Sequence, residues 1–80
     1  MSKQICVYGA QWCPDTRRSR QCLERLGIPF DWRDIDHDKE ARAFVEQVNK
    51  GNRSIPTIVF PDGSILVEPS DTELETKCRS

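Results

Sequence analysis

Apolar residues recur along the chain at two spacings, and the change of spacing separates predicted strands from predicted helices. Lys3 to Tyr8 and Phe30 to Asp36 are short runs rich in β-branched and aromatic residues, which predicts strands. Pro14 to Leu26 and Asp38 to Lys50 place apolar residues three or four positions apart, which predicts helices with one buried face. A glycine directly after each helical segment supplies a stop signal. The first 50 residues are therefore predicted to run strand, helix, strand and helix.

The remainder of the chain predicts a hairpin and a last helix. Thr57 to Phe60 and Ser64 to Val67 are predicted as short strands, because the Pro-Asp-Gly segment 61–63 between them favours a tight turn. Ser70 or Asp71 is expected to cap the last helix. This order of elements predicts an α/β fold, in which a parallel strand pair and an antiparallel hairpin share one mixed four-stranded sheet with helices on its faces. We expect residues 1–80 to form a single domain.

The strongest chemical signal is the segment Cys13-Pro14-Asp15-Thr16, where the first predicted strand gives way to the first predicted helix. A cysteine just before a helix that has proline in its first position faces unpaired backbone N–H groups and the positive end of the helix dipole, and both favour the thiolate. This junction also lies at the carboxyl edge of the first strand, where open α/β sheets usually carry out their chemistry. Cys13 is therefore the candidate nucleophile.

Neighbouring side chains supply candidates for stabilising the thiolate and for binding a substrate. Thr16, one turn into the helix, has a hydroxyl and a backbone N–H that can hydrogen-bond the sulfur. Arg17 can add positive charge and reach a substrate, whereas Asp15 opposes the thiolate. Trp12 and Tyr8 are expected to flank the sulfur as apolar walls, and Trp12 is the stronger candidate because an exposed indole beside a thiol needs a reason.

Composition narrows the possible partners. The chain has 80 residues, of which 36% are hydrophobic and 31% charged, and a net charge of −1, which describes a small core under an ordinary soluble surface. No basic patch with interleaved aromatic residues, apolar run of about 20 residues or signal-like segment occurs, so we expect no nucleic-acid or membrane partner and a cytoplasmic location. Irregular cysteine spacing argues against a framework of two disulfides, and the single histidine, His37, lies far from every cysteine, so no metal site is expected.

Three segments together carry a resemblance to a known family. Trp12-Cys13-Pro14, the stretch 52–57 (Asn-Arg-Ser-Ile-Pro-Thr) and Asp62-Gly63-Ser64 resemble the glutaredoxin family of the thioredoxin fold. Asp34 to Thr57 and Glu68-Pro69-Ser70 are especially similar to the mycoredoxin branch. The resemblance implies three helices and a sheet ordered second, first, third and fourth strand. It also implies an oxidoreductase, without a tightly bound cofactor, that reduces mixed disulfides with a low-molecular-weight thiol such as glutathione or mycothiol. We expect it to act on disulfide-containing proteins as a monomer.

The resemblance also assigns candidate binding residues. The proline that matches Pro56 is cis in this family and leaves the backbone N–H and C=O of the preceding residue, here Ile55, facing the reactive sulfur. The alternative is that Pro56 simply begins an edge strand. Ser70 and Asp71, at the start of the last helix, match a segment whose backbone N–H groups take a carboxylate. Asp71 fits a plain helix cap equally well.

Departures from the family pattern indicate the mechanism. Thr16 stands where many glutaredoxins have a second cysteine, and Cys22 lies about 13 Å further along the helix axis, whereas a disulfide needs Cα atoms within roughly 7 Å. Cys13 is therefore expected to work alone, by a monothiol route.

Ala10 replaces the glutathione-binding lysine of many relatives, which leaves the identity of the thiol open. Two alternatives remain: a carrier that holds a [2Fe–2S] cluster between two subunits, and a non-catalytic thioredoxin-like binding module.

Overall fold

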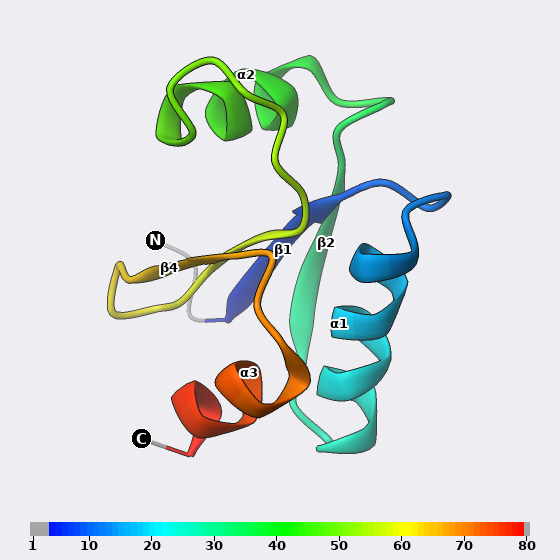
Figure 1. Cartoon of the computed structure of the whole chain (residues 1–80), viewed down its shortest axis with the longest axis vertical. Coiled ribbons are helices and arrows are strands. Elements are labelled where there is room, and N and C mark those ends of the chain that lie inside the picture. The colour runs from blue at the N-terminus through cyan, green and yellow to red at the C-terminus, as the bar shows by residue number, and fades with distance from the viewer. Residues whose placement is uncertain (1–3, 80) are drawn as a thin grey trace.

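A mixed four-stranded sheet forms the centre of the computed structural model, which describes residues 4–79. Its strands are β1 (Ile5–Gly9), β2 (Phe30–Asp34), β3 (Thr57–Val59) and β4 (Ile65–Val67), in the order β2-β1-β3-β4. β1 runs parallel to β2 and antiparallel to β3, and β3 and β4 form an antiparallel hairpin (Figure 1). The predicted α/β fold and strand order are therefore confirmed. Lys3, the predicted start of the first strand, lies outside the described residues.

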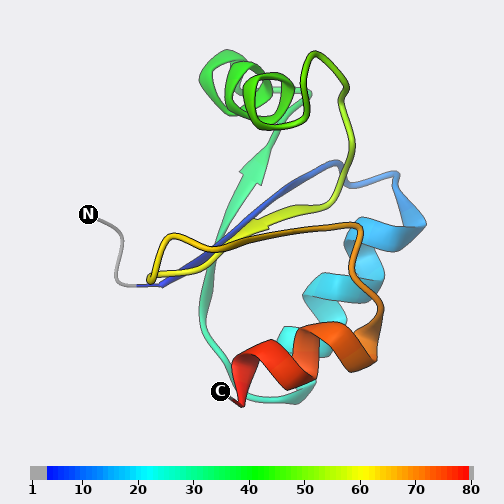
Figure 2. The ribbon, with the colours of Figure 1, turned by 60° about the vertical axis from the view of Figure 1, so that its left-hand side comes forward.

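Three helices cover the two faces of this sheet. They are α1 (Pro14–Arg25), α2 (Lys39–Val48) and α3 (Asp71–Cys78). α1 and α3 lie together on one face, and α2 lies across the other face near the carboxyl end of β1 (Figures 1 and 2). The β1–α1 junction that holds the candidate nucleophile is therefore at the end of the sheet that α2 covers.

The α1–α3 face of the sheet holds the main apolar core. Alternate residues of β1 point into it and meet the inner sides of both helices, as the two-residue period of a strand requires. Val7, Leu23, Ile58 and Leu74 are all fully buried there, and each such side chain contributes about 1.5–3 kcal/mol by leaving water. This packing fixes α1 against β1, and with it the direction in which the start of α1 faces.

Side-chain capping explains why β2 and α2 are shorter than predicted. β2 ends at Asp34 rather than Asp36, because the Asp34 carboxylate accepts the Asp36 N–H at 2.9 Å and its carbonyl accepts the His37 N–H at 3.1 Å, which turns the chain. α2 begins one residue late because Asp38 is its N-cap, whose side chain accepts the Ala41 N–H at 3.0 Å. The predicted element types are right, and local polar bonds set their ends.

The other element ends differ from the predicted ranges by one or two residues. β1 ends at Gly9, one residue beyond the predicted Tyr8. α1 ends at Arg25 because Leu26 is the C-cap and Gly27 takes a φ of +71°. α2 ends at Val48, two residues before the predicted end. The predicted hairpin strands each lose one residue, since the Phe60 N–H donates to the Ser64 carbonyl at 2.9 Å within the turn.

Candidate active site

Cys13 is the N-cap of α1. Its backbone is extended, with φ −80° and ψ 119°, and Pro14 follows in the first turn of the helix. The Cys13 N–H donates to the Ala10 carbonyl at 3.1 Å, while its side chain makes no capping bond. Among residues 4–79, the Asp15 and Thr16 N–H groups donate to no backbone carbonyl. The sulfur therefore stands at a helix N-terminus whose two available donors have no other backbone partner, as predicted from the Cys-Pro junction.

The surroundings of Cys13 are more enclosed than its position in a turn suggested. Only 8% of the residue is exposed, and it packs in an apolar cluster that β1, the β2–α2 loop, α2 and the segment before β3 all supply. The cluster consists of Ala10, Cys13, Ile35, Ala41, Val45 and Ile55, with Tyr8 against it. Only a small part of Cys13 is therefore open to a substrate disulfide.

Thr16 is fully buried between α1 and β1. A Cβ atom added at Gly9 would lie 2.5 Å from the Thr16 Cγ2 atom and 2.6 Å from its Oγ1 atom, so β1 and the first turn of α1 are in close contact here. The Thr16 hydroxyl has no hydrogen-bond partner among residues 4–79. Thr16 thus carries a free hydroxyl one turn after Cys13, although no bond from it to the sulfur is formed.

Several charged side chains of α1 lie near its N-terminal end. Arg17 is exposed and lines a shallow cavity on the outer side of α1 together with Arg20, Gln21 and Glu24. Arg18, rather than Arg17, approaches the Asp15 carboxylate, at 3.3 Å. The negative charge that was expected to oppose the thiolate is therefore offset within the helix.

Trp12 and Tyr8 occupy different levels of the site. Trp12 is 67% exposed, and its indole Nε1–H donates to the Asp36 Oδ2 atom at 2.7 Å. Tyr8 is half-buried and stacks on Phe44, with ring centroids 4.7 Å apart, while burial and the adjacent Cys6 raise its pKa to about 12. Trp12 therefore forms the outer rim beside Cys13, and Tyr8 supports the cluster from beneath α2.

The segment before β3 brings Ile55 into the cluster that contains Cys13. The Ile55–Pro56 peptide bond is cis, as the family resemblance implied. The Pro56 carbonyl accepts the Glu68 N–H at 2.8 Å, whereas the Ile55 N–H and C=O form no backbone hydrogen bond within residues 4–79. The N–H and C=O groups of Ile55 are therefore both available to a ligand.

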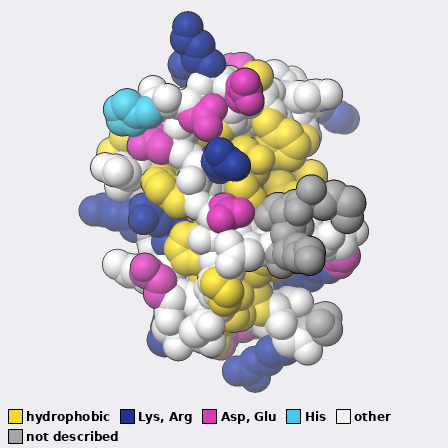
Figure 3. All heavy atoms as spheres, turned by 180° about the vertical axis from the view of Figure 1, so that it is seen from behind, with side chains coloured by type: hydrophobic (Ala, Val, Ile, Leu, Met, Phe, Trp, Pro, Cys, Tyr) yellow, Lys and Arg dark blue, Asp and Glu magenta, His cyan; other side chains and the backbone are white. Residues whose placement is uncertain are grey.

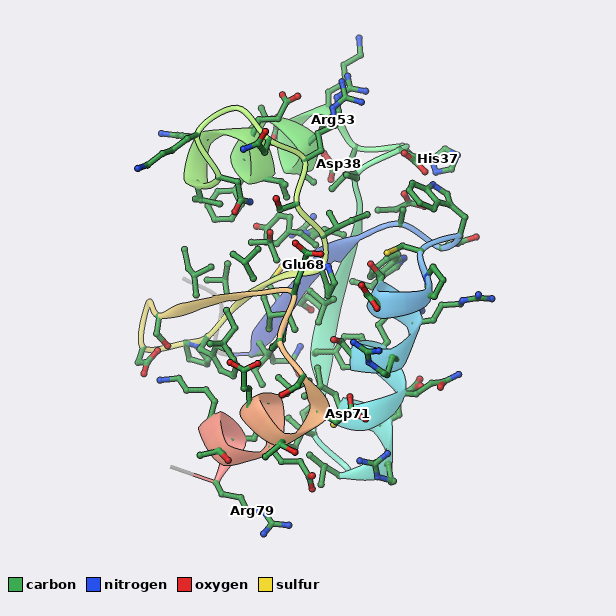
Figure 4. The ribbon with its side chains drawn as sticks, viewed as in Figure 1. His37, Asp38, Arg53, Glu68, Asp71 and Arg79 are labelled. Carbon is green, nitrogen blue, oxygen red and sulfur yellow. The ribbon has the colours of Figure 1, made fainter. Side chains whose placement is uncertain are left out.

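The start of α3 is closed by its own cap. The Ser70 Oγ atom accepts the Glu73 N–H at 3.1 Å, and the Glu73 carboxylate accepts the Ser70 N–H at 3.0 Å, so these two residues form a capping box. Ser70 is therefore the cap, and Asp71 is the first helical residue. The Asp71 carboxylate lies 3.7 Å from Arg18, which links α3 to α1 (Figure 4). Of the four first-turn donors, those of Asp71 and Thr72 remain for a ligand.

Sequence reasoning missed Asp36 and Gly9, which contact Trp12 and Thr16 respectively, and it missed the contact between Arg18 and Asp71. A partial signal for Asp36 was present, because three aspartates alternate with other residues from the last residue of β2 onward. His37, in the same loop, has a side chain that is 82% exposed and pairs with Asp34 at 3.0 Å.

The other three cysteines differ from Cys13 in their surroundings. All four are free thiols. Burial raises the pKa of Cys22, which is fully buried between α1 and α3, and burial together with nearby Cys22 raises the pKa of Cys78. Cys6 lies on β1, next to Tyr8 and Arg33.

Within the described part of the chain, no group of three or more histidine, cysteine or acidic residues is placed to hold a metal ion. Nor is any helix there long and apolar enough to cross a membrane. On the face shown in Figure 3, basic and acidic side chains are interspersed with hydrophobic ones.

Comparison with known proteins agrees with this geometry. The glutaredoxin family model matches residues 5–65. A protein of Mycobacterium tuberculosis (strain H37Rv) that is named as a glutaredoxin is 40% identical over 73 residues, covering 91% of this chain and 87% of the relative. Mycoredoxin 1 of Corynebacterium glutamicum is 36% identical over 73 residues, covering 91% of this chain and 90% of the relative.

Solved structures show the same fold. A glutaredoxin from Archaeoglobus fulgidus superimposes with a TM-score of 0.79 at 26% identity, covering 98% of this chain and 88% of the other. A buckwheat glutaredoxin in complex with glutathione gives a TM-score of 0.67 at 16% identity, covering 95% of this chain and 68% of the other. Together with the match over residues 5–65, these similarities show that the chain belongs to the glutaredoxin family of thiol–disulfide oxidoreductases.

Proposed function

We propose that the protein reduces mixed disulfides by a monothiol mechanism centred on Cys13. The observation that carries this proposal is the helix N-cap position of Cys13 together with the absence of a second thiol one turn on, where Thr16 stands. Cys22 is fully buried on the core side of α1, more than two turns away, and cannot reach the sulfur without unwinding the helix.

The reaction requires two exchanges. The Cys13 thiolate attacks the sulfur of the small thiol within a protein mixed disulfide, so the original S–S bond breaks and the protein leaves as a thiolate. Cys13 is then joined to the small thiol. A second small-thiol molecule attacks this adduct as its thiolate, which releases the symmetrical small-molecule disulfide and regenerates the Cys13 thiolate. The protein sulfur is thus reduced to a thiol, the second small thiol is oxidised, and the two small thiols leave joined as one disulfide.

The surrounding residues divide the work of stabilisation and binding. Pro14 begins the helix, and the Asp15 and Thr16 N–H groups stabilise the Cys13 thiolate. Arg17 adds positive potential at the helix surface. The Ile55 peptide group before Pro56 pairs with the backbone of a peptide-like thiol in the manner of an added strand.

Residues at the rim of the site bind the part of the small thiol that lies beyond its sulfur and backbone. Trp12 supplies an apolar wall, and Tyr8 supports it from the cluster. The Asp71 and Thr72 N–H groups, next to Ser70, receive a carboxylate or another acceptor of the ligand. We further propose that the protein works as a monomer, in a reducing compartment such as the cytoplasm, where its four cysteines stay free.

Single cysteine variants test this proposal. Cys13→Ser should abolish reduction of a peptide mixed disulfide, while Cys22→Ser and Cys78→Ser should retain most of the activity. Wild-type protein should also be oxidised with the disulfides of glutathione, mycothiol and bacillithiol, and the Cys13 adduct identified by mass, which names the cosubstrate. Full activity of Cys13→Ser, or no adduct with any of the three thiols, would refute the proposal.

A further inference from the structure

Trp12 has an unusual environment for the residue next to a thiol. It is the most exposed of the large hydrophobic side chains in the described part of the chain, at 67%. Its indole Nε1–H nevertheless donates to the carboxylate of Asp36, 24 residues away, at 2.7 Å. A bond this short from an N–H to a carboxylate belongs to the stronger, charge-assisted class. The polar edge of the ring is therefore anchored while much of the side chain remains open to solvent.

The carboxylate that anchors Trp12 is itself held by an ordered loop. The Asp36 N–H donates to the Asp34 Oδ1 atom at 2.9 Å. Between them, the Ile35 N–H donates to the Gly9 carbonyl at 2.9 Å, at the end of β1 from which the Cys13 turn also departs. The loop and the turn that carries Trp12 are thus fastened to the same strand end, so the distance between Asp36 and Trp12 is fixed by the sheet.

Asp34 is suited to its part in this arrangement. Burial acts to raise the pKa of Asp34, but the hydrogen bonds from His37 and from the Asp36 N–H outweigh it and hold the pKa below its ordinary value. Asp34 therefore stays an ionised acceptor at neutral pH. Figure 4 shows His37 projecting from this loop, on the side of the molecule where α1 begins. The loop that holds Asp36 is therefore fixed by hydrogen bonds and borders the thiol site.

We propose that Asp36 is a positioning residue of the thiol site: its carboxylate holds the Trp12 ring in place as a preformed wall against which the mixed disulfide docks before Cys13 attacks. This inference rests on the proposed function, because the wall matters only if Cys13 receives such a substrate. An unanchored exposed indole would be ordered only when the substrate binds, and ordering one side chain weakens affinity by about two- to tenfold.

Three variants separate the effect of the Asp36–Trp12 hydrogen bond from the effects of the Asp36 charge and of the Trp12 ring. Asp36→Ala removes the acceptor. Asp36→Asn removes the charge but keeps an amide oxygen that can accept the indole N–H. Trp12→Phe keeps an aromatic ring but has no N–H to donate. Glu40→Ala is the matched control, because it removes another exposed carboxylate, in the first turn of α2, without contacting Trp12.

Two measurements are made on each variant. The first is the chemical shift and exchange rate of the two indole N–H signals in an NMR spectrum, with Trp12→Phe assigning the Trp12 signal and Trp32 serving as the internal reference. The second is KM and kcat for a peptide carrying glutathione as a mixed disulfide, or mycothiol if the thiol panel selects it. The NMR measurement reports on the Asp36–Trp12 bond whether or not the protein is an enzyme.

Asp36→Ala should move the Trp12 signal upfield, speed its exchange and raise KM about two- to tenfold, with kcat within about twofold of the wild type. In Asp36→Asn the KM should stay close to the wild-type value. Asp36→Ala combined with Trp12→Phe should be no worse than Trp12→Phe alone, because both changes remove one bond.

An unchanged KM in Asp36→Ala, equal effects of Asp36→Asn and Asp36→Ala, or additive effects in the double variant would overturn the positioning role. A rise in KM in Glu40→Ala equal to that in Asp36→Ala would also overturn it, since surface charge alone would then explain the effect. If instead Cys13→Ser proves as active as the wild type, the proposed function fails, and the NMR result still decides whether Asp36 anchors Trp12.

Discussion

Gly9 is a point of close contact between β1 and the first turn of α1, and replacing it by alanine tests whether that contact constrains α1. Gly9 lies in β1, and a Cβ atom there would sit 2.5 Å from the Thr16 Cγ2 atom, well inside van der Waals contact. Overpacking a tight interface costs about 1–3 kcal/mol, whereas replacing glycine by alanine gains roughly 0.4–1 kcal/mol through the unfolded state. Gly9→Ala should therefore lower the free energy of unfolding by about 1–2 kcal/mol.

Shortening Thr16 should remove this penalty. Thr16→Ala by itself loses a buried methyl group but also removes a buried hydroxyl without a partner, so its own effect should stay within about 1 kcal/mol. In the Gly9→Ala/Thr16→Ala double variant the stability should return close to that of Thr16→Ala, which gives a coupling of about 1–2 kcal/mol between the two sites.

Urea denaturation followed by circular dichroism measures these differences in the free energy of unfolding. Gly63→Ala is the matched control: Gly63 has a φ of +89° with no atom within 4 Å of an added Cβ, so its cost is backbone strain that Thr16→Ala cannot relieve. A neutral or stabilising Gly9→Ala, or a double variant in which the two effects simply add, would show that the close contact does not constrain α1.

Three further outcomes are expected. Iodoacetamide at neutral pH should label Cys13 before Cys22 and Cys78. Burial raises the pKa of Cys22 and of Cys78, so each has less of the reactive thiolate. Peptide mapping by mass spectrometry that finds Cys78 labelled first would contradict this. Tyr8, the only tyrosine, should ionise near pH 12 in the folded protein, as followed by its absorbance at 295 nm. Its contribution to stability is therefore complete below about pH 10 and is lost as the pH rises through 12. Ionisation of Tyr8 near pH 10 in the folded protein would refute its burial. Ser70→Ala should lower the free energy of unfolding by about 0.5–2 kcal/mol in urea denaturation through loss of the capping box, whereas Thr72→Ala, at an exposed position in the first turn of α3, should cost less; equal losses would argue against the cap.

Local patterns were sufficient to predict most of the architecture. The spacing of apolar residues, the turn residues and the helix caps together predicted the helices and strands, and the Cys-Pro junction located Cys13 at the start of α1. These features depend on neighbours within one turn or one strand, where residue preferences act directly. The strand order and the cis peptide before Pro56 came from the family resemblance, because local preference does not determine them.

The parts of the site that could not be predicted depend on contacts between distant segments. Trp12 and Asp36 meet only because Ile35 is hydrogen-bonded to the end of β1, and Arg18 reaches Asp71 only because α3 packs on α1. Cys13 is more enclosed than a turn residue usually is, because the segment around Ile55 returns against it. Such contacts depend on how whole helices and strands pack together. The spacing of residues along the chain does not predict that packing directly.

The central claim, that Cys13 acts without a partner cysteine, is tested most directly by the mass of the oxidised protein. Reduced wild-type protein is treated with 2-hydroxyethyl disulfide, quenched with acid and weighed intact, with Cys13→Ser and a Cys6→Ser/Cys22→Ser/Cys78→Ser variant measured beside it. The account predicts a stable gain of one 2-mercaptoethanol unit on Cys13 in the wild type and the triple variant, and none in Cys13→Ser. A wild-type product that has instead lost two hydrogens, as an internal disulfide would, while the triple variant keeps its adduct, would contradict it.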